Sequence, residues 1–214
     1  MKIILTITII LFVAFFSKAK AQAPDYFESS KQILVLRPTL NSSTISVKTT
    51  GSDASTPASR IGVGLGVEYW QKIAKTFFVS GGLHYNSFGY KDVRTGYLNI
   101  PVIINYLSKS QMLTLGIGAY GGYAISGKYK NSSFDWVKMK YGEAATDNRS
   151  HTDAGLIINA GYSLFSIGHL TSYAYIGLKD MTSNNRQDGT TRKMLSWTIS
   201  YAIPVGGNVL NKKK

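Results

Sequence analysis

Apolar and polar positions alternate along most of the chain from Ile61 onward. The segment 61–69 places Ile, Val, Leu, Val and Tyr at odd positions and Gly, Gly, Gly and Glu at even ones. Successive side chains of a β-strand point to opposite faces, so a period of two predicts a strand. The alternation recurs, strongly or weakly, in segments 33–47, 77–86, 98–106, 113–125, 153–164, 170–178 and 194–205. The pattern predicts an all-β domain of eight strands.

The two faces of these strands have an unusual composition. One face is aliphatic and aromatic, while the other is mostly Gly, Ser, Asn and Tyr. A soluble sandwich would place many charged residues on its second face. Small neutral polar groups suit a narrow barrel interior, and an apolar outer face suits lipid. We therefore predict an eight-stranded antiparallel up-and-down transmembrane β-barrel. The alternative is a periplasmic barrel whose apolar face encloses a ligand.

The connections between the predicted strands support the barrel. The gaps at 48–59, 87–95, 127–152 and 180–192 are long and polar, whereas those at 71–75, 108–111 and 166–169 are short. Long and short connections alternate when one barrel end faces the exterior and the other faces the periplasm.

Aromatic residues cluster near both kinds of connection, which predicts two membrane-facing girdles. The girdle candidates are Tyr69, Trp70, Phe77, Phe78, Tyr106 and Phe165 near the short turns, and Tyr85, Phe88, Tyr90, Tyr97, Tyr123, Tyr129 and Tyr173 near the long ones.

The amino terminus has the pattern of a secretory signal peptide. A lysine at position 2 precedes the uncharged segment 3–16, and Ala19 and Ala21 form the small-residue cleavage pattern before Gln22. We predict a signal peptide at 1–21, a short segment at 22–31, the barrel domain at 32–206 and a flexible basic tail at 207–214.

Composition narrows the chemistry further. The chain has 24 Lys and Arg against 11 Asp and Glu, and it has no cysteine. Thiolate metal sites, disulfides and cysteine nucleophiles are therefore excluded. A basic exported chain meets the anionic lipopolysaccharide of the bacterial surface rather than nucleic acid.

Two consecutive predicted strands carry a family resemblance. Residues 97–106 read Tyr-Leu-Asn-Ile-Pro-Val-Ile-Ile-Asn-Tyr, and after a tight turn residues 115–122 form a glycine-rich strand. The segment 81–129 resembles the outer-membrane β-barrel domain family of Gram-negative bacteria, which includes PorT-type proteins. The chain departs from the family pattern at Asn99, where Glu is frequent. The resemblance implies a small OmpA/OmpX-like barrel in the outer membrane and implies no activity.

Candidate catalytic residues are few. The histidines are His84, His151 and His169, and they lack the spacing of metal ligands. A barrel hydrolase would need a base beside a hydroxyl or carboxylate, for which His151, Asp153 and Ser150 are the candidates. We expect no enzyme activity, no cofactor and no metal.

Two groups of residues are candidates for a structural or binding role. The first is a polar network pointing into the lumen, which an eight-stranded barrel is just wide enough to hold. Its predicted members are Glu68, His84, Asn99, Asn105, Tyr120, Asn159 and Tyr175. The second is the basic and aromatic loop 127–152, whose contact candidates are Lys128, Lys130, Trp136, Lys138 and Lys140.

The sequence thus predicts a non-enzymatic outer-membrane protein with a structural or binding role through long extracellular loops. Its expected partners are outer-membrane lipid, lipopolysaccharide and an envelope protein. The alternatives are an accessory subunit of a secretion or surface-assembly machine, as the PorT-type resemblance implies, and a barrel hydrolase acting on lipid.

Overall fold

The computed structural model describes residues 30–108, 112–142, 147, 149–164, 168–182 and 189–209. Its strands are β1 (Ser30–Thr49), β2 (Arg60–Ala74), β3 (Phe77–Tyr90), β4 (Val93–Leu107), β5 (Leu113–Lys130), β6 (Trp136–Lys138), β7 (Thr152–Leu164), β8 (Gly168–Gly177) and β9 (Thr190–Val209). In the described residues, no helix is long and apolar enough to cross a membrane.

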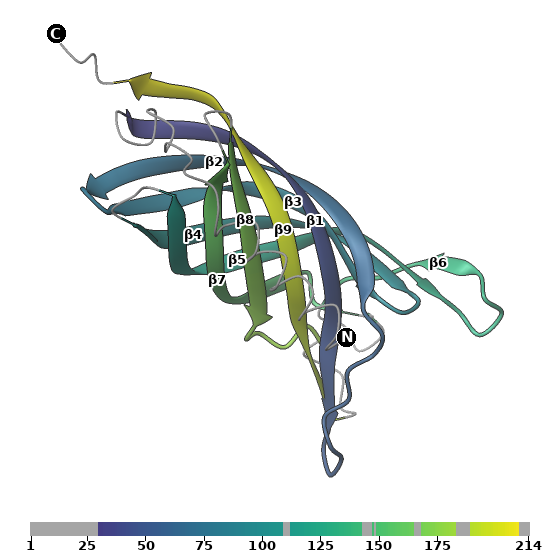
Figure 1. Ribbon diagram of the computed structural model, residues 1–214. Helices are drawn as coiled ribbons and strands as arrows, with labels where there is room; N and C mark the ends of the chain where they lie inside the picture. The colour runs from purple at the N-terminus through teal and green to yellow at the C-terminus, as the bar shows by residue number, and fades with distance from the viewer. Residues whose placement is uncertain are drawn as a thin grey trace, which may run out of the picture.

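Eight of the strands close into a barrel. The order around the sheet is β4-β3-β2-β1-β9-β8-β7-β5, and β4 also pairs with β5, which completes the ring. Every pair in the ring is antiparallel, including the seam between β1 and β9. The three-residue strand β6 lies outside the ring and pairs only with the end of β5, so the two form a hairpin that projects beyond the barrel (Figure 1). Closure leaves no unpaired sheet edge in the ring, as a membrane-spanning sheet requires. The predicted eight-stranded barrel is confirmed.

The apolar side chains of the barrel point outward. Ile61, Val63 and Leu65 on β2 are 73%, 62% and 51% exposed, while Glu68 between exposed neighbours is buried. The other ring strands show the same inversion, with exposed aliphatic residues such as Ile100 and Ile117. The apolar face therefore points toward lipid, and the alternative barrel with an apolar interior is wrong.

The interior is layered along the barrel axis. At the short-turn end, a cluster contains Ile33, Val35, Trp70, Phe78, Leu107 and Ala202. At the long-loop end, a larger cluster contains Ile45, Phe88, Tyr97, Ile103, Tyr120, Ala124, Ile157, Tyr173, Tyr175, Met181 and Met194. Buried polar side chains occupy the space between them. Side chains therefore occupy the interior of the barrel, as they occupy the core of a soluble protein.

One connection differs from its prediction. The segment 87–95, expected as a long loop, consists mostly of paired strand, because β3 and β4 pair as far as Tyr90↔Val93. The turn between them is Lys91–Asp92, with Lys91 at a φ of 35°. The strands continue because Phe88 and Thr95 are buried. The polar composition of the segment comes from its turn and its outward-facing positions, such as Lys91 and Arg94, and not from an irregular loop.

The aromatic girdles are only partly present. Tyr69, Phe77, Tyr106, Tyr85 and Tyr123 are exposed on the outer surface. The prediction is wrong for Trp70, Phe78, Phe88, Tyr97 and Tyr173, which are buried inside the barrel. These residues occupy the alternate strand positions that point inward, where their rings fill the lumen. Phe165 lies outside the described residues.

The paired strands extend beyond the boundaries 32–206 predicted for the barrel domain. Strand β1 starts at Ser30, which pairs with Val209 at the end of β9. The first three residues of the predicted flexible tail 207–214 therefore belong to β9, since pairing with β1 satisfies their backbone hydrogen bonds. The predicted signal peptide, with Ala19, Ala21 and Gln22, lies outside the described residues.

Candidate functional site

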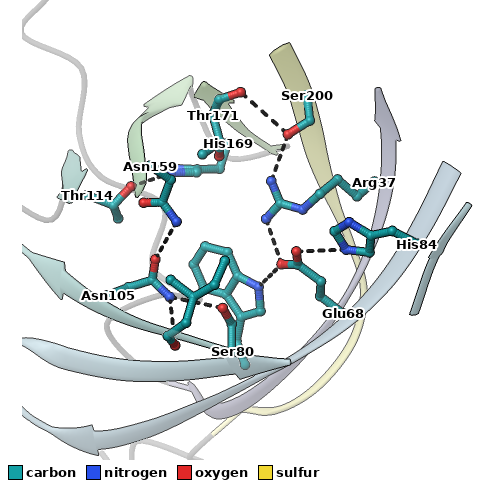
Figure 2. A network of polar contacts seen from close by, with 12 residues as sticks. Arg37, Glu68, Ser80, His84, Asn105, Thr114, Asn159, His169, Thr171 and Ser200 are labelled. Carbon is teal, nitrogen blue, oxygen red and sulfur yellow. Dashed lines mark hydrogen bonds and ion pairs between the residues drawn. The ribbon is translucent and has the colours of Figure 1, made fainter. Parts of the chain in front are cut away.

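A buried ion pair lies at the centre of the polar layer. Arg37 on β1 donates from Nη2 to Oε2 of Glu68 on β2 at 2.9 Å, and both side chains are fully buried. Arg37 also donates from Nη1 to Oγ of Ser200 on β9 at 2.8 Å. Arg37 therefore connects the first two strands to the last one across the seam of the barrel (Figure 2). A buried charge of this kind is tolerated only when it is paired and hydrogen-bonded.

Two further side chains contact the Glu68 carboxylate. Trp70 Nε1 donates to Oε2 at 2.7 Å. His84 Nε2, on β3, lies 2.9 Å from Oε1. The Arg37 guanidinium lies over two rings, 5.6 Å from the centroid of Trp70 and 5.1 Å from that of Tyr173. Arg37 and Glu68 are thus enclosed by polar and aromatic groups on several sides.

A second branch of hydrogen bonds crosses the opposite wall of the barrel. Asn159 on β7 donates to Oδ1 of Asn105 on β4 at 3.0 Å, and Asn105 donates to Oγ of Ser80 on β3 at 3.0 Å. His169 on β8 pairs through Nε2 with Oγ1 of Thr114 on β5 at 2.8 Å, and through Nδ1 with Ser163 at 3.2 Å. Together with the contacts of Arg37 and Glu68, these separate groups of hydrogen bonds involve side chains from all eight strands of the ring (Figure 2).

A glycine on β2 makes room for Arg37, Glu68, Trp70 and His84, which we call the ion-pair cluster. A Cβ built on Gly66 would lie 2.4 Å from Cδ2 of His84, which is closer than real Cβ contacts. Gly66 pairs with His84 in the register, and Arg37 is its partner on the other side. The absence of a side chain at Gly66 therefore allows the imidazole to lie across β2 toward Glu68.

All seven residues predicted to point into the lumen are buried. The structure brings Glu68 and His84 into the ion-pair cluster, and it brings Asn105 and Asn159 into the amide chain. Tyr120 and Tyr175 instead pack edge to face in the aromatic cluster at the long-loop end. Asn99 is fully buried, and its amide makes no hydrogen bond with the described residues.

Sequence reasoning missed the residue at the centre of the cluster. Arg37 shares the inward parity of Ile33 and Val35, both of which are buried. Two features of the sequence could have predicted the pair. The inward face of β1 has a single cation in its buried part, and the inward face of the neighbouring strand β2 has a single carboxylate.

The candidate catalytic residues do not form a catalytic arrangement. His151 is stacked between Tyr123 and Tyr141, with ring centroids 4.9 and 5.2 Å away. Asp153 points into the barrel, where Tyr120 donates to its Oδ2 at 2.8 Å. Within the described residues, no hydrogen bond joins His151 to Asp153, and no group of three acidic or histidine side chains is placed to hold a metal ion.

The basic loop residues gather around the β5–β6 hairpin. Lys128 and Lys130 end β5, Trp136 and Lys138 belong to β6, and Lys140 follows. The Trp136 ring receives three cations, which are Lys130 at 5.6 Å and two residues absent from the sequence prediction, Arg60 at 5.9 Å and Arg94 at 4.7 Å. Arg60 is the first residue of β2, and Arg94 is the second residue of β4. Trp136 therefore contacts cations from β2 and β4, two strands that the sequence of the loop alone did not connect with the hairpin.

Known structures of small barrels resemble the chain at low sequence identity. Ail, the attachment invasion locus protein of Yersinia pestis, is 11% identical over 82% of this chain and 99% of Ail, with a TM-score of 0.44. Neisserial surface protein A is 7% identical over 78% of this chain and 96% of that protein, with a TM-score of 0.45. OprG from Pseudomonas aeruginosa is 10% identical over 86% and 97%, with a TM-score of 0.39. No curated protein matches the sequence significantly.

A family model gives the assignment. The model of the outer membrane protein beta-barrel domain matches residues 35–183, which is more than half of the chain and includes the ion-pair cluster and the β5–β6 hairpin. The chain belongs to the outer membrane protein beta-barrel domain family and is a protein of the bacterial outer membrane.

Proposed function

We propose that this outer-membrane barrel is a non-enzymatic, non-conducting binding protein that engages surface lipopolysaccharide through the segment 127–152. The observation that carries the proposal is the contrast between a filled interior and an exposed, basic and aromatic hairpin. Trp136 is 39% exposed and Phe134 is 77% exposed beyond the barrel rim. Aromatic rings beside lysines and arginines suit a ligand with both anionic and apolar parts.

The filled interior supports a closed lumen. Inward side chains form two apolar clusters with a polar layer between them, in which Arg37 is bonded to Glu68 and Asn159 to Asn105. Opening a path through this layer would leave buried polar groups unpaired, at a cost of about 1–3 kcal/mol each. His151 and Asp153 have separate partners, which favours binding over hydrolysis.

The test compares two tryptophans of equal exposure. Trp136 and Trp197 are 39% and 40% exposed, and Trp197 lies on β9, away from the hairpin. We expect Trp136→Ala to reduce the retention of detergent-solubilised protein on immobilised lipopolysaccharide, and Trp197→Ala to leave it unchanged. Equal retention of both variants would contradict the proposal.

The closed lumen is tested separately. We expect proteoliposomes that contain the full chain to swell no faster in small sugars than empty liposomes. Rapid swelling would show a conducting lumen and would refute that part of the proposal.

A further inference from the structure

Cations lie directly opposite one another on three neighbouring strands at the long-loop end. In the register, Arg94 on β4 is the partner of Lys128 on β5, and Lys128 is the partner of Lys138 on β6. Directly opposed residues of antiparallel strands project from the same face of the sheet. All three are exposed. They therefore form a row of positive charges across the outer surface.

Arg60 extends this row by one further strand. The residue opposite Arg94 on β3 is Gly89, and a Cβ built on Gly89 would lie 2.9 Å from Cδ of Arg60. The Arg60 side chain thus lies over the glycine, next to Arg94, and its Nη1 donates to the carbonyl of Lys91 at 3.3 Å. Arg60 and Arg94 also lie over the same Trp136 ring. We call Arg60, Arg94, Lys128 and Lys138 the basic row.

The protein neutralises little of this charge. Among the described residues, the one salt bridge near the row joins Lys130 to Asp92 at 3.8 Å, and it involves no member of the row. Like charges directly opposite each other on a sheet are destabilising. A sequence could relieve the repulsion by a glutamate at any of these positions. Four neighbouring cations are instead kept together, and two of them, Arg60 and Arg94, lie over one indole ring. This is the arrangement of a site that receives its anion from outside.

The position of the row identifies the source of the anion. The row lies on the outward face, and lipid-facing residues follow directly along the same strands. Ile125, three residues before Lys128, is 50% exposed, and Ile100 farther along β4 is 59% exposed. The row therefore borders the apolar band at its extracellular edge, where the charged headgroups of outer-leaflet lipid lie.

We propose that the basic row and Trp136 form a binding site for the phosphate groups of an outer-leaflet glycolipid headgroup. This inference rests on the proposed function and adds to it the ligand group and the two arginines from outside the loop. Guanidinium groups bind phosphate with two parallel hydrogen bonds, and lysines add charge without geometric constraint. Trp136 holds the arginines in place by cation–π contact and offers its exposed edge to the sugar or acyl part of the lipid.

The experiment uses the full chain in neutral detergent and measures binding by native mass spectrometry. The probes are bisphosphorylated lipid A, the same lipid with its phosphates removed, and inorganic phosphate as a competitor. The test variant is Arg60→Gln/Arg94→Gln. The matched control is Lys31→Gln/Lys75→Gln, which removes the same charge from exposed positions at the short-turn end.

We expect bisphosphorylated lipid A to bind the wild type and the control at least tenfold more tightly than the test variant. Removing the lipid phosphates should abolish this difference. Equal binding of the test variant and the control would overturn the site while leaving the proposed function intact. Equal binding of both lipid forms would overturn the role of phosphate. Displacement of the lipid by equimolar inorganic phosphate would show that the site binds free phosphate, and would overturn the lipid as the source of the anion. Failure of the wild type to bind either lipid would instead refute the proposed function.

Discussion

Arginines lie over two tryptophan rings of the barrel, in opposite settings. Inside, Arg37 lies 5.6 Å from the Trp70 ring, and outside, Arg94 lies 4.7 Å from the Trp136 ring. Arg37 is fully buried and has Glu68 at 2.9 Å. Arg94 is exposed, and its register partner is another cation, Lys128. The same pair of residue types therefore occurs once with a carboxylate and once without.

The comparison distinguishes an arginine whose charge is neutralised inside the fold from arginines whose charge is available to a ligand. A buried guanidinium must be neutralised by the protein itself, because no solvent reaches it. An exposed one is free to take its counter-charge from a ligand. The inner charge is thus neutralised within the protein, where Arg37 joins β1 to β2 and to β9 across the seam. The outer row is incomplete, and its role depends on what lies next to it in the membrane.

The largest predicted effect comes from breaking the inner pair. Glu68→Gln leaves the Arg37 charge buried without compensation, which costs about 3–5 kcal/mol of unfolding free energy. Urea unfolding in detergent, followed by the change in gel mobility of the unboiled protein, measures the loss. The control Asp92→Asn removes the exposed partner of Lys130 and should cost about 0–1 kcal/mol. Comparable losses in both variants would refute the distinction between the two settings.

A smaller effect is expected from filling the space under His84. Gly66→Ala places a methyl group against the imidazole, whose Cδ2 lies 2.4 Å from the built Cβ. Overpacking of this kind costs about 1–3 kcal/mol. The matched change Gly121→Ala, on β5, meets no atom within 4 Å and should be nearly neutral. The urea midpoints of the two variants decide the question, and a neutral Gly66→Ala would show that His84 has room to move.

The smallest effect has the opposite sign. Arg94→Gln removes one charge from the basic row, so in the absence of lipid it should relieve repulsion and raise the unfolding free energy by about 0.2–1 kcal/mol. The gain should shrink as salt rises, because screening weakens repulsion between exposed charges. Measured midpoints at low and high ionic strength test both statements. A loss of stability at low salt would mean that the row is already neutralised within the protein.

The strand pattern predicted the barrel because alternation reports directly which face meets lipid. It predicted the inward position of Glu68 and His84 for the same reason, since parity alone decides it. It missed Arg37, because the surrounding segment is mainly apolar and its single cation has no partner within β1. Ionic partners on different strands depend on register, which single-strand patterns do not contain.

The same limit explains why the sequence did not predict the basic row. Lys128 and Lys138 are visible in sequence as a basic loop, but their alignment with Arg94 and Arg60 depends on the pairing of β4, β5 and β6. The predicted loop 87–95 was wrong for a related reason, because polar residues on a hairpin that extends past the membrane resemble those of an irregular connection.

The most direct test measures how phosphate on lipid A changes the stability of three proteins, which are the wild type, Glu68→Gln and Arg60→Gln/Arg94→Gln. A ligand at 100 times its Kd adds about 2.7 kcal/mol to the unfolding free energy. We predict that bisphosphorylated lipid A, compared with its dephosphorylated form, stabilises the wild type and Glu68→Gln by equal increments and leaves the double-arginine variant unchanged. An equal increment in the double-arginine variant would contradict the claim that the outer charges are neutralised by lipid phosphate.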